Sequence, residues 1–183
     1  WAVYHQFTAS DPETDYLLLD TTAAVTDSDA LWNDTAPTST VFSVGDSDLT
    51  NASTKLFTYF CWAKVEGYSS FGNYVGNNSA DGPFLYTGFK PAFLMIKSTG
   101  VQDWRIYDNV RSPYNVMANR LWPNLTNVEG TSADGVLDFL SNGFKFRDNS
   151  AGTNNGGSSV TYLYMAFAEN PFGGSGVAQA KAR

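Results

Sequence analysis

The residues that most often carry enzyme chemistry are scarce in this sequence. His5 is the only histidine and Cys61 the only cysteine, and they lie far apart along the chain. A nucleophile needs an activating base beside it, so Ser-His-Asp and Cys-His schemes depend on one imidazole. Cys61 falls in the apolar run 56–63, which predicts a buried and inert thiol. His5 is expected to be a polar residue at a strand end. The sequence therefore predicts no catalytic residues and a protein that is not an enzyme.

Acidic loops give the nearest approach to a metal site. Asp27-Ser28-Asp29 and Asp46-Ser47-Asp48 place hard oxygen ligands at a spacing that can hold calcium. Neither loop continues into the full ligand pattern with a terminal Glu, so solvated turns are expected. No cluster of His and Cys suits zinc, and no glycine-rich phosphate-binding motif occurs. We therefore expect no metal and no cofactor.

Aromatic residues in turn-rich stretches are the better functional signal. Flat rings can stack on sugar rings, and neighbouring Asn or Asp side chains can bind hydroxyl groups. Such rings also cover sheet edges and are enriched at subunit interfaces, so both interpretations stay open. The candidate residues for glycan binding or a subunit interface are Trp32, Tyr68, Phe71, Tyr74, Tyr114 and Trp122.

The charge distribution bears on the partners. The net charge is −7 and the sequence pI about 4.5, so nucleic acid is not expected as a partner. Residues 1–89 hold two basic and eleven acidic residues, a net charge of −9, whereas residues 90–183 hold nine and seven, a net charge of +2. This asymmetry indicates either a solvated acidic face or head-to-tail docking of copies. No apolar run has the length of a bilayer, so membrane insertion is not expected.

The elements that must position these residues are predicted to be strands. Aromatic residues make up 15% of the chain, and turn-forming Gly, Asn, Asp and Ser are frequent. Asn142-Gly143 between two apolar runs is a strong hairpin signal. Short strands with frequent turns indicate an all-β, antiparallel β-sandwich or jelly roll. The strands are expected at 1–7, 16–20, 40–45, 56–65, 84–88, 92–98, 103–108, 136–140, 143–147 and 160–168.

The chain matches itself at a spacing of 103 residues. Trp1 then meets Trp104, Tyr4 meets Tyr107, and identities recur as far as Glu66 with Glu169. An internal duplication is therefore predicted. The equivalent of residues 67–103 would lie before Trp1. Either that segment was removed or left out, or the fold closes with one whole unit and part of another. The predicted units are a partial first repeat, 1–66, and a complete second repeat, 67–172, packed as one sandwich or two and followed by a flexible tail, 173–183. Glu66 and Glu169 occupy equivalent positions in the two units. Each is expected to cap a strand or to bind Lys or Arg of its own unit.

Several longer stretches carry a resemblance. Residues 66–77, 81–93, 137–145 and 162–172, together with 1–5 and 35–45, resemble a domain common in tailed bacteriophages, especially marine ones. The resemblance covers nearly the whole of 1–172 and implies a concanavalin-like lectin sandwich. It implies a structural or tail-fibre-like protein at the virion surface, and it brings no catalytic motif.

Three functions follow as hypotheses. The first is a bacteriophage virion structural protein of fibre, tail or capsid surface, which binds its own copies and other virion proteins and contacts host cell-surface polysaccharide. The second is a glycan-degrading depolymerase on the same sandwich. The third is a lectin-like module outside any virus. Two similar units with a single histidine favour assembly over catalysis, although β-sandwiches host all three functions.

Overall fold

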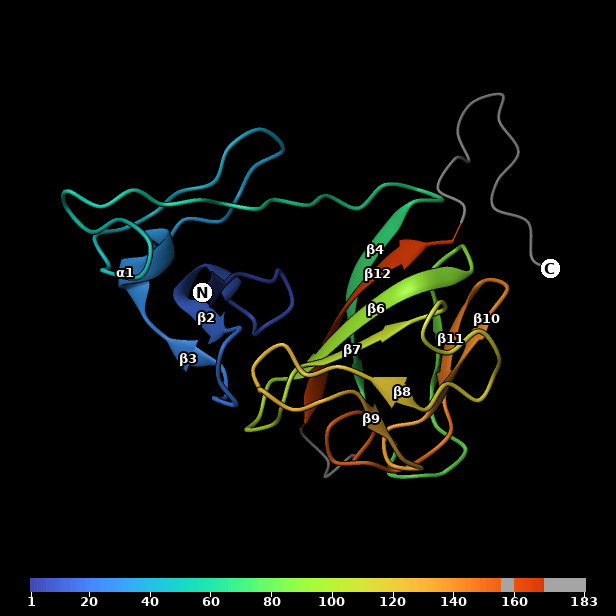
Figure 1. Cartoon of the computed structure of the whole chain (residues 1–183). Coiled ribbons are helices and arrows are strands. Elements are labelled where there is room, and N and C mark those ends of the chain that lie inside the picture. Colours follow the sequence, from blue (N-terminus) through green and yellow to red (C-terminus); the bar gives the residue numbers. More distant parts are fainter. Residues whose placement is uncertain (156–159, 170–183) are drawn as a thin grey trace.

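The computed structural model describes residues 1–155 and 160–169, and its regular secondary structure consists mostly of antiparallel strands (Figure 1). Short N-terminal elements lie to one side, and the larger strands from β4 onward form the main body. The all-β, antiparallel character that the composition predicts is confirmed. The predicted tail, 173–183, lies outside the described residues.

The main sheet has four strands in the order β4-β12-β6-β7. They are β4 (Ser69–Val75), β12 (Thr161–Ala168), β6 (Pro91–Ser98) and β7 (Arg105–Asp108). β12 is hydrogen-bonded on both sides, to β4 and to β6. Its apolar run therefore forms the centre of the sheet, where a strand with few polar residues is favoured.

A second sheet has three strands in the order β10-β11-β5. β10 (Leu137–Leu140) and β11 (Gly143–Phe146) form the hairpin that Asn142-Gly143 predicts, with Leu140 opposite Gly143. β5 (Phe84–Tyr86) pairs with the other side of β11. The turn signal in the sequence was therefore sufficient to predict this hairpin.

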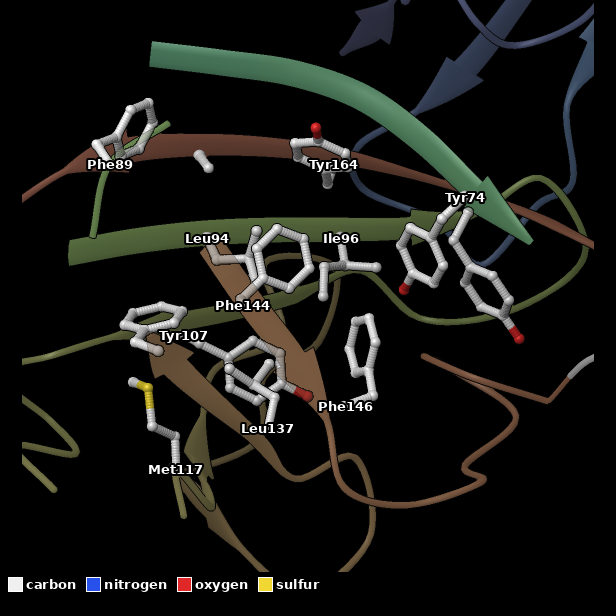
Figure 2. Close-up of a cluster of buried hydrophobic side chains, with 13 residues drawn as sticks. Tyr74, Phe89, Leu94, Ile96, Tyr107, Met117, Leu137, Phe144, Phe146 and Tyr164 are labelled. Carbon is white, nitrogen blue, oxygen red and sulfur yellow. The ribbon is translucent and has the colours of Figure 1, made fainter. Parts of the chain in front are cut away.

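Both sheets contribute to one cluster of buried apolar side chains (Figure 2). Leu94 and Ile96 of β6 enter it from the main sheet, and Phe144 and Phe146 enter it from β11. The contributing residues alternate along each strand, because successive side chains point to opposite faces. The full cluster is Tyr74, Phe89, Leu94, Ile96, Tyr107, Met117, Leu137, Phe139, Phe144, Phe146, Tyr162, Tyr164 and Ala166.

The N-terminal residues form a small sheet in the order β1-β2-β3, with bounds Ala2–Val3, Asp15–Leu18 and Thr26–Asp27. Short helical turns follow β1 (η1, Pro12–Thr14) and β3 (α1, Asp29–Trp32). A second buried cluster joins this sheet to the main one, with Leu17 against Trp104 and Leu163. The Trp104 indole N–H donates to the Leu18 carbonyl at 2.9 Å. The small sheet thus covers part of the outer face of β12.

Two predicted strands are wrong. Residues 40–45 and 56–65 both lie in the described part of the chain, and neither range forms a strand there. The other eight predicted ranges each contain a strand. The prediction missed β4, β3 and the short pair β8 (Asn119–Arg120) and β9 (Gly130–Thr131), as well as α1. Apolar alternation alone does not make a strand, because the backbone also needs a neighbour to bond.

Gly143 lies in a tight approach between β11 and β5. A Cβ placed on Gly143 would lie 2.0 Å from the Leu85 carbonyl oxygen, which is backbone and cannot rotate away. We expect Gly143→Ala to lower the free energy of unfolding by about 1–3 kcal/mol, measured by denaturant titration. Gly100→Ala is the control, because its nearest neighbour would be the Ser98 hydroxyl at 3.4 Å. Equal stabilities of the two variants would contradict this close approach.

Candidate binding surface

An extended segment carries large apolar side chains into solvent. Residues 56–65 run from the N-terminal elements to the start of β4 (Figure 1). Trp62 is 57% exposed and Leu56 is fully exposed. We call the exposed rings on and beside this segment the aromatic strip: Trp1, Phe42, Tyr59, Phe60 and Trp62.

The rings of the aromatic strip form two contact groups, one around Phe60 and one around Tyr59. Phe60 stacks on Trp62 with ring centroids 6.1 Å apart and contacts Trp1 at 5.8 Å. Tyr59 meets Phe42 at 5.2 Å, and its hydroxyl donates to the Thr50 carbonyl. Clusters of large exposed apolar side chains are typical of an interaction site.

Cys61 lies in the middle of the segment and is exposed. The prediction of a buried thiol is therefore wrong. It assumed that residues 56–65 form a strand, whereas in the structure Val65 alone of this range is paired, in an isolated bridge to Ser69. The thiol is accessible to reagents, which makes it a useful probe of this surface.

Two of the six candidate aromatic residues are part of the interior. Trp32 ends α1, is buried, and its indole N–H donates to the Asp15 carbonyl at 2.9 Å. Tyr74 is in β4, is buried, and its hydroxyl donates to the Thr153 carbonyl at 2.7 Å. The prediction that these rings lie in loops is wrong, and neither ring presents a face to a ligand.

Tyr68 and Phe71 lie together near the start of β4. Both make edge contacts with Phe167 of β12, at 5.6 and 6.1 Å between ring centroids. Tyr68 is exposed and Phe71 half-buried. Phe93 of β6 also contacts Phe167, so the three strands share an aromatic patch. This patch lies near the β4 end of the extended segment.

Trp122 is separate from the other candidates. It is half-buried, and the Arg120 guanidinium lies 5.2 Å from its ring centroid. Such a cation–π contact stabilises the local loop by about 0.5–1 kcal/mol. Trp122 also packs so closely on Gly130 of β9 that a Cβ there would overlap the indole ring. These contacts give Trp122 a structural role.

Tyr114 is 83% exposed and lies at a small pocket of about 210 Å³. Lys90 and Asn109 supply polar groups to the wall, and both bind Glu169: Lys90 Nζ lies 3.0 Å from one carboxylate oxygen, and Asn109 Nδ2 donates to the other at 3.1 Å. The expected pairing of Glu169 with a basic residue is confirmed. Of the six predicted aromatic residues, two are buried, two lie together near the start of β4, and Trp122 and Tyr114 make other contacts. The structure therefore does not bring the six into one site.

No metal-binding group of three or more His, Cys, Asp or Glu side chains occurs within residues 1–155 and 160–169. Asp27 lies in β3, and Asp46 and Asp48 lie in the loop that follows α1. In the part of the chain that the structure describes, none of the helices has the length and apolar character needed to span a membrane.

His5 follows β1 and packs against the main sheet. The Phe7 amide donates to Nδ1 at 3.3 Å, and Nε2 lies 3.4 Å from the Tyr164 carbonyl oxygen. This arrangement suits a neutral imidazole with its proton on Nε2. Burial lowers the pKa of His5 to about 4, although the hydrogen bond to Tyr164 opposes the shift.

Stability should therefore fall on acidification. Between about pH 6.5 and pH 4 the unfolded chain binds a proton at His5 and the folded chain does not, so the free energy of unfolding decreases as pH falls through this window. The shift corresponds to at most about 3 kcal/mol, and partial exposure reduces this to about 1–2 kcal/mol. Unfolding titrations at pH 7 and 4.5 should show a smaller difference for His5→Gln than for the parent chain. An unchanged difference would exclude His5 as the cause.

Comparison with known protein families matches residues 1–171 to a domain of unknown function, DUF7483. The match covers nearly the whole chain, so the chain belongs to this family. Neither the curated proteins nor the solved structures contain a significant match.

Proposed function

We propose that this member of the DUF7483 family is a structural building block that binds other protein subunits. The observation that carries the proposal is the aromatic strip. Exposed apolar area of this kind is removed from water when subunits associate, and aromatic residues are enriched at such interfaces. The resemblance to tailed-phage proteins supports a place in a virion, as a component of fibre, tail or capsid surface.

We further propose that the two larger sheets form a β-sandwich of the lectin or jelly-roll type. The support is the cluster of thirteen buried side chains to which both sheets contribute. Sheets packed face to face interdigitate their inner side chains in this way. A sandwich provides a rigid body from which the exposed segment can reach a neighbour.

Internal duplication is the third element of the proposal. At the spacing of 103 residues, β1, β2 and β3 overlap in position with β7, residues 118–121 and β9. The same order of pairing recurs, since Ile106 pairs with Leu121 and β8 pairs with β9. The registers of the two units differ. Val3 lies opposite Leu17 whereas Ile106 lies opposite Leu121, a difference of one residue, and the β8–β9 register differs from that of β2–β3 by two residues.

A tight turn supports the same proposal. The Ser47 carbonyl accepts from the Thr50 and Asn51 amides at 3.1 and 2.8 Å. The Ser150 carbonyl accepts from the amides of Thr153 and Asn154 at 3.1 and 2.7 Å. Each residue of the first turn is 103 positions before its counterpart. Residues 1–66 then form an incomplete first unit and residues from 67 a complete second unit.

Association is the property to test first. In the double variant Phe60→Ser, Trp62→Ser we expect a lower mass in solution at micromolar concentration than for the parent chain, measured by light scattering after size exclusion. The control is Val110→Ser, which changes an exposed apolar side chain away from the strip. A parent chain that is monomeric at low salt, alone and with other virion proteins, would refute the building-block proposal. Added salt should weaken any contribution from docking between the acidic and basic halves.

Glycan contact is a second candidate function, favoured by the exposed Tyr114 ring beside the polar pocket. Binding to host cell-surface polysaccharide should be lost in Tyr114→Ala and retained in Val110→Ser. Release of oligosaccharides from that polysaccharide would instead support the depolymerase alternative. Electron microscopy of native particles with a label on this chain would separate a virion component from a lectin-like module outside a virus.

A further inference from the structure

The ranges 40–45 and 56–65 were predicted as strands and are not strands in the structure. Each corresponds to an observed strand 103 residues later in the chain. At the spacing of 103 residues, 40–43 corresponds to β11 and 58–65 corresponds to β12. In the second unit β11 lies between β10 and β5, and β12 lies between β4 and β6. Within residues 1–155 and 160–169, β4, β5 and β6 occur in the second unit alone.

The side chains of β12 that face the core have apolar or aromatic counterparts 103 residues earlier. Tyr162, Tyr164 and Ala166 point into the core and are buried. At the same spacing stand Tyr59, Cys61 and Ala63, and all three are exposed. The same apolar pattern is thus buried where β4 and β6 flank it and solvated where they do not.

Two polar side chains differ between the units in the same way: each is bonded to the β4–β6 segment in the second unit, and its counterpart in the first unit is exposed. The Asn154 side chain holds the connection between β4 and β5, accepting from the Asn77 amide at 2.8 Å and donating to the Ser79 carbonyl at 2.8 Å. Asn51, at the equivalent position of the same turn, is exposed. Glu169 binds Lys90, which precedes β6, whereas its counterpart Glu66 is exposed.

We infer that residues 40–65 bind a segment with the sequence pattern of residues 69–98, which provides the counterparts of β4, β5 and β6. The inference rests on the proposed building-block function and on the duplication, and it names the class of partner. The added β6-type strand pairs antiparallel with residues 58–65, as β6 does with β12. Backbone bonds provide affinity in such strand addition, and the alternating apolar side chains provide specificity.

A second copy of this chain does not fit the role. Its own β4 and β6 are already bonded to β12, and its β5 is bonded to β11. The inward side chains of its β6, Leu94 and Ile96, are fully buried in its own core. Donating these strands would require that copy to unfold its main sheet.

Cys61 provides the test, because it is the only cysteine and residues 67–103 contain none. We would add a peptide of residues 67–103 to the full chain and, in parallel, place a copy of 67–103 directly before Trp1. In both experiments modification of Cys61 by a thiol reagent should slow by at least about 100-fold, because labelling then requires local opening. Amide exchange of 57–65 should slow in parallel. The control is the same added segment carrying Leu94→Asp and Ile96→Asp, which should leave the rate unchanged.

An unchanged Cys61 rate in both experiments would overturn the inference. Protection of Cys61 in the unextended chain that disappears on dilution would also overturn it, since a second copy would then be the occupant. That result would leave the building-block proposal intact. The parent chain could also stay monomeric while the added wild-type segment protects Cys61. That result would support the inference and refute self-association.

Discussion

Tyr162→Ala should lower the free energy of unfolding by about 3–5 kcal/mol, the range for removing a large aromatic side chain from a core. Tyr162 is 0% exposed and stacks on Tyr74 with ring centroids 5.1 Å apart. Its hydroxyl lies 2.8 Å from the Ala151 carbonyl oxygen and 3.1 Å from that of Asn155, and its single proton is shared between them. The change therefore leaves a cavity and removes the partner of two acceptors. Denaturant unfolding followed by tryptophan fluorescence would measure the loss.

Tyr59→Ala is the matched control, because Tyr59 stands 103 residues before Tyr162 and has the same side chain. Tyr59 is 43% exposed, so we expect a loss of about 1 kcal/mol or less. Equal losses at the two positions would contradict the difference in burial. If the β4-to-β6 segment proposed above is added, Tyr59 becomes buried and the cost of Tyr59→Ala should rise toward that of Tyr162→Ala.

Hydrophobic patterning was sufficient to predict the strands that form the core. The β6, β10, β11 and β12 ranges are apolar runs bounded by turn residues, and each was predicted within a few residues. β4 was missed because its buried positions include Ser69, Ser70 and Gly72. Gly72 lies under the Tyr164 ring, where a Cβ would come within 2.7 Å of the hydroxyl. These small residues are required by the neighbouring strand β12, which lies far along the chain. Such a requirement leaves no periodic pattern in the sequence of β4.

A lysine within β6 shows a similar limit. Lys97 is fully buried, and its ammonium group donates to the Ser98 and Gly100 carbonyls at 2.8 and 2.9 Å. Burial lowers the pKa of Lys97 to about 8. Lysine is almost never fully buried without partners, and here the partners are backbone carbonyls of the following turn. Sequence gives no sign that a turn will satisfy a charge in this way.

The candidate site was predicted only in part. Flanking turn residues predict that these aromatic residues are surface rings, yet Trp32 and Tyr74 are buried, and their polar groups donate to backbone carbonyls. The aromatic strip was missed because 56–65 reads as a buried strand. The sequence pattern was informative about what the segment is suited to form, whereas its exposure depends on which neighbours are present.

Asn154→Ala is the second change for which we expect a large effect. Asn154 is 0% exposed and joins three segments of the second unit. Its amide nitrogen donates to the carbonyls of Ser79 and Asp148 at 2.8 and 2.7 Å, and its side-chain oxygen accepts from the Asn77 amide. Removing the side chain leaves these buried backbone groups without a partner, at about 1–3 kcal/mol for each group that stays dry. We expect a loss of about 3 kcal/mol in the free energy of unfolding.

Asn51→Ala separates the side chain's role from that of the turn. Both asparagines donate their backbone amide to a serine carbonyl four residues earlier in the same kind of turn, and alanine retains that bond. Since Asn51 is exposed, its replacement should change stability by no more than about 0.5 kcal/mol. If both variants lost the same amount, the turn backbone would be the source of the effect. If only Asn154→Ala is destabilised, the difference in the free energy of unfolding between the two variants measures what the connection between β4 and β5 contributes to a complete unit. An added segment should give residues 40–65 a stabilisation of the same kind through Asn51.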